Sequence, residues 1–137
     1  MKIAIVNDLL LAVEAMRRVI KTVPTYEVAW VAYSGEEAVQ KCALERPDVI
    51  LMDLLMPGMD GAEATRKIME TSPCAILIVT ATVSGNISKV FEAMGNGALD
   101  TVCTPVLLNE SKADGAAALL SKIDNISKLI GHTKKPG

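Results

Sequence analysis

The sequence predicts an α/β fold with a five-stranded parallel sheet, strand order 2-1-3-4-5, and five helices. Three observations support this prediction. Short, almost continuously apolar runs alternate five times with amphipathic stretches along the 137 residues, as is typical of strands buried between two layers of helices. Hydrophobic residues make up 50% of the chain and aromatic residues only 3%, so we expect an aliphatic core. Right-handed crossovers then leave few topologies, of which this order is favoured.

The five strands are predicted from apolar runs bounded by turn residues. They are expected at residues 3–6, 27–33, 48–53, 75–80 and 98–104. In a flavodoxin-like sheet of this order, the switch point, where the strand order reverses, lies between the first and third strands. The carboxyl ends of these two strands therefore border the expected ligand site.

The five helices are predicted from apolar residues at helical spacing and from capping residues. They are expected near residues 9–20, 35–46, 60–71, 84–94 and 119–130. Ser34 with Glu37 three residues later has the pattern of a capping box, and Asp60 is expected to cap the third helix. The first helix is marked by Leu9, Val13, Met16 and Ile20, which recur at helical spacing. The apolar side of the fourth is assigned to Ile87, Val90, Phe91 and Met94.

Composition narrows the range of functions. The net charge of −2 is small and mixed in sign, which does not favour binding to nucleic acid or to a membrane surface. No apolar run approaches the roughly 20 residues of a membrane-spanning helix. The N-terminus lacks the layout of a signal peptide, so we expect a cytoplasmic protein. Three cysteines without metal-ligand spacing are interpreted as buried apolar residues; they are Cys42, Cys74 and Cys103.

The chain is predicted to form one domain over residues 1–130. Residues 104–115 are long for a connection between a strand and a helix and are expected to form an irregular loop. Residues 131–137 have the composition of a linker and include His132, which is expected to be solvated. We therefore expect these residues to begin a linker to a further, C-terminal domain.

Polar side chains follow three neighbouring strands of the predicted sheet. Asp8 follows the first strand, Asp53 ends the third and Thr80 ends the fourth. Two carboxylates at close range are costly unless a cation lies between them, and hard oxygen ligands suit Mg²⁺. Each residue alone has an ordinary explanation, such as a helix cap for Asp8. Together they predict phosphoryl chemistry on Asp53, with the Thr80 hydroxyl as a hydrogen-bond donor to a phosphoryl oxygen.

These residues resemble the receiver domain of two-component response regulators. The resemblance covers residues 1 to about 130, and its matching positions are Asn7-Asp8, Asp53, residues 56–61 (Met-Pro-Gly-Met-Asp-Gly) and Thr80-Ala81. It implies that Asp53 accepts phosphate from a histidine kinase. It also implies that Asp8, Asp53 and the backbone carbonyl of Leu55 bind Mg²⁺, with Asn7 holding a metal-bound water. Thr80 is the implied switch hydroxyl.

A narrower resemblance is to the N-terminal receiver of chemotaxis methylesterases, in particular those of Wsp-like surface-sensing systems. It is carried by residues 5–8, 12–18, 92–100 and Thr104-Pro105. It implies two partners: the histidine kinase of a chemosensory array, and a C-terminal serine hydrolase that removes methyl esters from receptor glutamates. These 137 residues contain no Gly-x-Ser-x-Gly elbow and a single histidine, so no hydrolase site is expected in them.

The sequence departs from the receiver pattern after the fifth strand. Thr104 stands where receivers normally carry a lysine, and Thr101 stands where they carry an aromatic switch residue. A neutral donor gives a weaker hydrogen bond than a charged one, and Lys112 is a candidate substitute cation. The surface formed by the fourth helix, fifth strand and fifth helix is the contact surface that the resemblance implies.

Three alternatives remain open. The missing lysine motivates a degenerate receiver, a phosphate-independent interaction module. A receiver attached to a DNA-binding output domain is the second alternative. A flavodoxin-like flavin or nucleotide binder is the third, and it is disfavoured because no Gly-rich turn follows the first strand.

Overall fold

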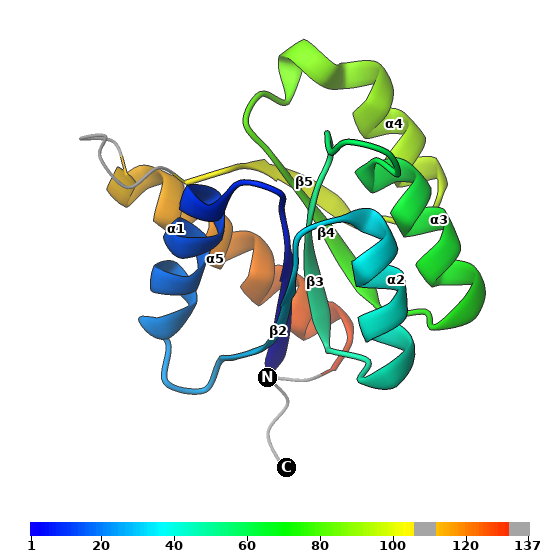
Figure 1. Cartoon of the computed structure of the whole chain (residues 1–137). Coiled ribbons are helices and arrows are strands. Elements are labelled where there is room, and N and C mark those ends of the chain that lie inside the picture. The colour runs from blue at the N-terminus through cyan, green and yellow to red at the C-terminus, as the bar shows by residue number, and fades with distance from the viewer. Residues whose placement is uncertain (106–111, 132–137) are drawn as a thin grey trace.

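The computed structural model describes residues 1–105 and 112–131, with side chains of the second range described from residue 115 onward. Its sheet has five parallel strands in the order β2-β1-β3-β4-β5 (Figure 1), which confirms the predicted topology. The strands are β1 (Lys2–Val6), β2 (Glu27–Ala32), β3 (Val49–Asp53), β4 (Ala75–Thr80) and β5 (Asp100–Cys103).

The helices form one layer on each face of the sheet. They are α1 (Leu10–Lys21), α2 (Gly35–Leu44), α3 (Gly61–Thr71), α4 (Ile87–Gly95) and α5 (Lys112–Leu129), with a short 3₁₀ turn, η1 (Ser84–Asn86), before α4. Helices α1 and α5 cover one face, and α2, α3 and α4 cover the other (Figure 1). None of the helices in the described ranges is long and apolar enough to cross a bilayer.

The sheet divides the core into two aliphatic clusters because successive strand residues point to opposite faces. Ile5 and Leu51 belong to the cluster under α1 and α5, together with Ile123. Ile50 and Met52 belong to the cluster under α2, α3 and α4. All five side chains are 0% exposed. The expected aliphatic core is therefore confirmed.

The predicted caps of α2 and α3 are both present. Ser34 Oγ accepts a hydrogen bond from the backbone N–H of Glu37 at 3.1 Å, and Glu37 Oε1 accepts one from the N–H of Tyr33 at 2.8 Å. In a capping box the Glu37 side chain would accept from the N–H of Ser34, the cap residue. Here it accepts from the N–H of Tyr33, the residue before the cap. At α3, Asp60 Oδ1 accepts from the N–H of Glu63 at 2.9 Å. Both helices begin where the sequence predicted.

The apolar stripes predicted for α1 and α4 are only partly buried. Leu9 precedes α1 and is 63% exposed, although Val13, Met16 and Ile20 are buried as expected. In α4, Ile87 is 46% exposed and Phe91 68% exposed, whereas Val90 and Ala93 are buried. The helix packs through Val90 and the small Ala93, so its most apolar side chains face outward. Periodicity finds an apolar side but does not say which residues reach the sheet.

Two further expectations need correction. Cys42 is buried, but Cys74 is half-buried and Cys103 is exposed, because β5 is an edge strand and its last residue lies at the rim. Helix α5 begins at Lys112, so the connection after β5 is shorter than predicted. Residues 106–111, residues 132–137 with His132, and the Lys112 side chain lie outside the described residues.

Candidate functional site

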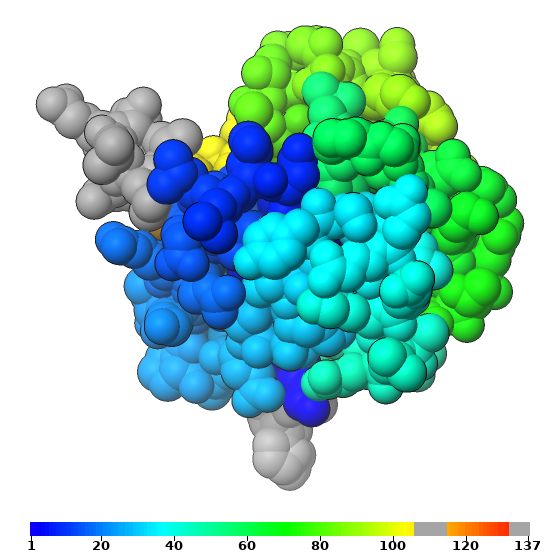
Figure 2. All heavy atoms as spheres, in the orientation of Figure 1, coloured from blue at the N-terminus to red at the C-terminus, as the bar shows by residue number. Residues whose placement is uncertain are grey.

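The sheet register places the predicted residues at one edge. Val6 lies opposite Met52, so the next residues, Asn7 and Asp53, leave neighbouring strands at the same level. Asp53 in turn lies opposite Val79, one residue before the end of β4. Figure 2 shows the start of α1 and the loop after β3 side by side at the upper edge of the molecule. The fold therefore brings the ends of β1, β3 and β4 together at this edge.

Gly61 closes the loop that follows Asp53. Its backbone N–H donates to the carbonyl of Leu54 at 2.8 Å. This bond joins the two ends of the loop beside the carboxyl end of β3. A Cβ atom at Gly61 would lie 2.1 Å from the Asp53 carbonyl oxygen, a backbone atom that cannot move aside. Only glycine fits this close approach. The motif marked Gly61 in the sequence, but this reason for it appears only in the fold.

Asp60 connects this loop to two helices. Besides capping α3, its Oδ2 accepts a hydrogen bond from Lys89 Nζ of α4 at 2.7 Å. Burial raises the pKa of Asp60, but the hydrogen bonds from Lys89 and from the Glu63 N–H outweigh it and hold the pKa below its ordinary value. Sequence reasoning missed Lys89, because 29 residues separate the partners and no local pattern links them.

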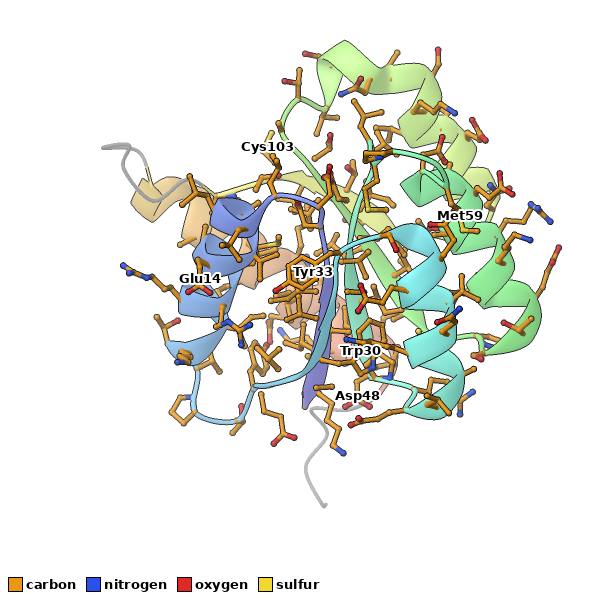
Figure 3. The ribbon with its side chains drawn as sticks, in the orientation of Figure 1. Glu14, Trp30, Tyr33, Asp48, Met59 and Cys103 are labelled. Atoms are coloured by element: carbon orange, nitrogen blue, oxygen red, sulfur yellow. The ribbon has the colours of Figure 1, made fainter. Side chains whose placement is uncertain are left out.

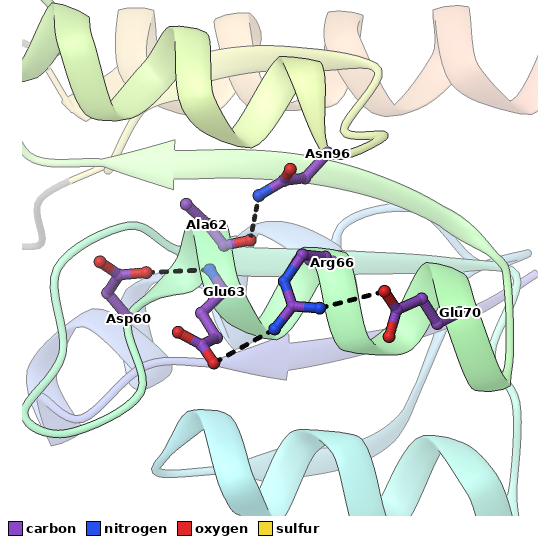
Figure 4. Close-up of polar contacts among 6 residues, drawn as sticks. All are labelled: Asp60, Ala62, Glu63, Arg66, Glu70 and Asn96. Carbon is purple, nitrogen blue, oxygen red and sulfur yellow. Dashed lines mark hydrogen bonds and ion pairs between the residues drawn. The ribbon is translucent and has the colours of Figure 1, made fainter.

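The first turns of α3 are held by further polar contacts. Figure 4 shows Arg66 between Glu63 and Glu70, with distances of 3.4 and 3.0 Å. It also shows Asn96, which follows α4, donating to the Ala62 carbonyl at 2.9 Å. These contacts fix the helix that receives the loop from Asp53. The Arg66 pairs are exposed and contribute little to stability individually.

The surroundings of Asp53 disfavour its ionised form. Burial, the larger cause, and the neighbouring carboxylate of Asp8 together raise its pKa to about 7. The backbone N–H groups of Leu54 and Leu55 hydrogen-bond the carboxylate and act in the opposite direction. No Lys or Arg from the described part of the chain is among the groups that shift this pKa most.

The donor set at this edge fits a hard divalent cation. Asp8 and Asp53 supply carboxylate oxygens close enough for their charges to oppose each other, and a cation between them would remove that repulsion. Across residues 1–105 and 115–131, no group of three or more His, Cys, Asp or Glu side chains could enclose a metal. A cation here would need backbone oxygens and water as further ligands, which is the arrangement that Mg²⁺ takes in proteins.

Asn7 has a clear structural role. Its side chain is 2% exposed, and its Oδ1 accepts a hydrogen bond from the N–H of Leu9 at 2.9 Å. Its own backbone N–H donates to the Ala32 carbonyl at 3.0 Å. These two bonds fix the turn between β1 and α1, and that turn carries the exposed Asp8. Asn7 therefore positions Asp8 whether or not it also contacts a water.

Thr80 ends β4 and Thr104 follows β5 at the same edge, whereas Thr101 lies within β5. Thr80 is buried, and its carbonyl accepts a hydrogen bond from the half-exposed Thr104 at 3.0 Å. Thr101 has a buried hydroxyl without a hydrogen-bond partner. Figure 3 shows Cys103 at this end of the sheet and Trp30 toward the opposite end. Trp30 is therefore badly placed to sense a metal at Asp53.

Comparison with protein families and curated proteins agrees with the geometry. The family described as response regulator receiver domain matches residues 3–114. A protein-glutamate methylesterase/protein-glutamine glutaminase of Pseudomonas putida is 57% identical over 136 residues, 99% of this chain and 40% of that protein. One from Pseudomonas aeruginosa is 56% identical over 137 residues, 100% of this chain and 41% of that protein. The chain spans about two fifths of the length of these curated relatives.

Solved structures show the same architecture. The response regulator domain of Thermotoga maritima CheB is 29% identical, with a TM-score of 0.84 over 93% of this chain and 96% of that one. The REC domain of AraT, a response regulator from Geobacillus stearothermophilus, is 25% identical with a TM-score of 0.80 over 98% of both chains. The five-stranded fold is thus shared with response regulator domains.

Proposed function

The chain belongs to the response regulator receiver domain family, and we propose from this that Asp53 accepts a phosphoryl group from a histidine kinase of a chemosensory pathway. One observation carries the proposal. Asp53 lies at the carboxyl edge of the sheet beside a second carboxylate, Asp8, with no compensating cation among the groups that most affect its pKa. Such a site is arranged to receive a cation and a phosphoryl group together.

The transfer itself needs little from the protein except position and charge. A carboxylate oxygen of Asp53 forms the new P–O bond as the P–N bond of the phosphohistidine breaks, and an acyl phosphate results. Asp53 must be ionised to attack, which its raised pKa resists near neutral pH. The N–H groups of Leu54 and Leu55 favour the ionised form and hold the carboxylate in place.

Mg²⁺ is the proposed cofactor. We assign its binding to Asp8, Asp53 and the backbone carbonyl of Leu55, with Asn7 holding a metal-bound water. When bound, the metal supplies positive charge that compensates the two carboxylates and the incoming phosphoryl oxygens. The exposed position of Asp8 is compatible with a cation that keeps several waters.

Two threonines complete the proposed site. The Thr80 hydroxyl is assigned as the switch donor to a phosphoryl oxygen, from the end of β4. Thr104 takes the place of the usual lysine and brings a neutral hydroxyl instead of a charge. Charge-assisted hydrogen bonds are roughly twice as strong as neutral ones. We therefore propose that the acyl phosphate is held less tightly on this side than in receivers that carry the lysine.

The receiver domain is proposed to regulate a larger cytoplasmic protein. The named relatives are protein-glutamate methylesterases more than twice as long as this chain, which supports a C-terminal methylesterase domain as the regulated partner. We propose that residues 1–130 form the receiver and that residues 131–137 begin the linker. The face formed by α4, β5 and α5 is the proposed contact surface, and Phe91 of α4 is exposed.

Intact mass measurement tests the phosphoryl-acceptor proposal. The domain is incubated with Mg²⁺ and a small acyl phosphate, and Asp53→Asn and Asp48→Asn variants are treated in parallel. We expect one phosphoryl adduct on the wild type and on Asp48→Asn, none on Asp53→Asn, and none when a chelator replaces Mg²⁺. An adduct on Asp53→Asn would place the phosphate elsewhere.

If the small acyl phosphate gives no adduct, the phosphorylation is tried once more with a histidine kinase of a chemosensory array as the donor. No adduct in either trial would support the degenerate alternative, a phosphate-independent interaction module. The missing lysine at Thr104 would then be part of a loss of function, and not an adjustment of phosphate lifetime.

A further inference from the structure

We propose that Cys42 and Cys74 form a redox-active dithiol, which peroxide oxidises to an intramolecular disulfide. Cys42 lies in the last turn of α2, and Cys74 lies directly before β4. Their Sγ atoms are 3.9 Å apart, although the residues are 32 positions apart in the sequence. This end of the sheet is opposite to the edge that carries Asp53 (Figure 1), so the dithiol is separate from the phosphoryl site.

The geometry favours a bond between these two sulfurs. A disulfide needs an S–S distance of about 2.05 Å, so the sulfurs must approach each other by roughly 2 Å, within reach of side-chain rotation. The Cys42 thiol also hydrogen-bonds to the Ser72 carbonyl at 3.5 Å, so its sulfur already faces the segment that carries Cys74. Cys42 is 1% exposed and Cys74 is half-buried. Peroxide therefore reaches the pair from the side of Cys74.

A positive charge lies beside the two thiols. Arg46 Nη1 donates to the Pro73 carbonyl at 3.2 Å, which holds the guanidinium next to Cys74. The hydrogen bond from Cys74 lowers the pKa of Cys42 below its ordinary value, and the charge of Arg46 acts in the same direction. Thiolates form most readily beside such a cation. Packing of apolar thiols alone requires neither the sulfur–sulfur contact nor the nearby guanidinium.

The oxidation balances with hydrogen peroxide as the oxidant. One thiolate of the pair attacks a peroxide oxygen, so an S–O bond forms, the O–O bond breaks and hydroxide leaves. The second sulfur then attacks the sulfenic acid: the S–S bond forms, the S–O bond breaks and water leaves with the thiol proton. Two thiols are oxidised, one peroxide is reduced, and two waters result.

Thiol mapping after oxidation tests the proposal. Reduced protein is treated with stoichiometric hydrogen peroxide, denatured, alkylated with N-ethylmaleimide and analysed by intact mass and peptide mapping. We expect loss of two hydrogen atoms, a Cys42–Cys74 cross-linked peptide, and alkylation of Cys103 alone. The oxidised form should melt about 5–10 °C higher, because the bond closes a loop of 32 positions, and dithiothreitol should reverse the shift.

Matched variants separate the dithiol from general thiol oxidation. Cys103→Ala should retain the cross-link, since that exposed thiol takes no part. Arg46→Gln should slow cross-linking about threefold or more, whereas Arg66→Gln, whose guanidinium pairs with Glu63 and Glu70 on α3, should not.

Two outcomes would overturn the proposal. In the first, Cys42 and Cys74 remain fully alkylated while Cys103 is oxidised. In the second, the only disulfides are between molecules. Both results come from the wild-type protein, so the decision does not depend on the folding of a variant that lacks Cys42 or Cys74.

Discussion

Replacing Asp53 by asparagine should stabilise the domain when no metal is bound. In the metal-free fold, burial and the nearby Asp8 raise the pKa of Asp53 from 3.8 to about 7. At 1.36 kcal/mol per pH unit, this displacement corresponds to about 4 kcal/mol. The side chain is partly exposed, so solvent screening reduces the value, and we expect a gain of about 1–2 kcal/mol. Asparagine keeps the shape and removes the charge.

The sign of the effect depends on pH. Between about pH 4 and 7 the unfolded chain has released the Asp53 proton while the folded, metal-free domain still binds it. Because the folded state binds more protons in this range, its stability falls as pH rises. The full penalty is present above about pH 7 and absent below about pH 4. The advantage of Asp53→Asn should therefore be largest at pH 8 and smaller at pH 5.

Urea unfolding in a chelator, followed by the fluorescence of Trp30, measures this difference. Trp30 is half-buried and its Nε1 donates to the Glu45 carbonyl at 2.8 Å, so unfolding changes its surroundings. Asp124→Asn is the control, because Asp124 pairs with Lys128 on the surface of α5 at 3.2 Å and should change stability by less than about 0.5 kcal/mol. Saturating Mg²⁺ should stabilise the wild type more than Asp53→Asn.

The reasoning would be refuted if Asp53→Asn were no more stable than the wild type at pH 8 in the chelator. That result would mean that Asp8 and burial do not oppose the charge on Asp53, and the case for a cation between the two carboxylates would lose its physical basis.

Three further predictions concern the backbone and the neighbours of Asp53. Gly61→Ala should destabilise the domain by about 3 kcal/mol or more in urea unfolding, because its Cβ would meet the Asp53 carbonyl oxygen at 2.1 Å. Gly95→Ala is the control. Nothing lies within 4 Å of a Cβ at Gly95, so this substitution should be neutral or stabilising. Ser34→Ala should cost about 1 kcal/mol by loss of the α2 cap, measured by thermal unfolding. Thr104→Lys should lower the pKa of Asp53 by about 1 or more in an NMR titration, and an unchanged pKa would show that the new cation does not reach it.

The sequence predicted the sheet well because its signals are local. Most strands are nearly continuous apolar runs, and all five strands and their order match the structure. The caps Ser34 and Asp60 were predicted because cap and bonded N–H are three residues apart. The shared location of the candidate residues was predictable for the same reason: Asp8 follows β1, Asp53 and Thr80 end β3 and β4, and parallel strands bring their ends to one edge. Their roles remain predictions.

The features that could not be predicted depend on contacts between distant segments. Phe91 was assigned to the same apolar side of the helix as Val90, yet α4 buries Val90 and Ala93 and leaves Phe91 68% exposed. The Asp60–Lys89 pair joins residues 29 positions apart. The Cys42–Cys74 contact spans 32 positions. In each case the deciding quantity is the packing angle or separation of two elements, which a single sequence does not encode in any short pattern.

The sheet topology has a consequence for folding during synthesis. Each strand pairs only with strands no more than two places away in chain order, so the sheet can grow from its N-terminus by successive strand–helix units, in line with N-terminal-first folding. Its α1 face is different, because Leu119 and Ile123 of α5 are fully buried there. The part of that face that α5 covers stays exposed until α5 leaves the ribosome. A chain that stops before α5 would therefore present a wide apolar surface and should aggregate instead of accumulating as a smaller soluble domain.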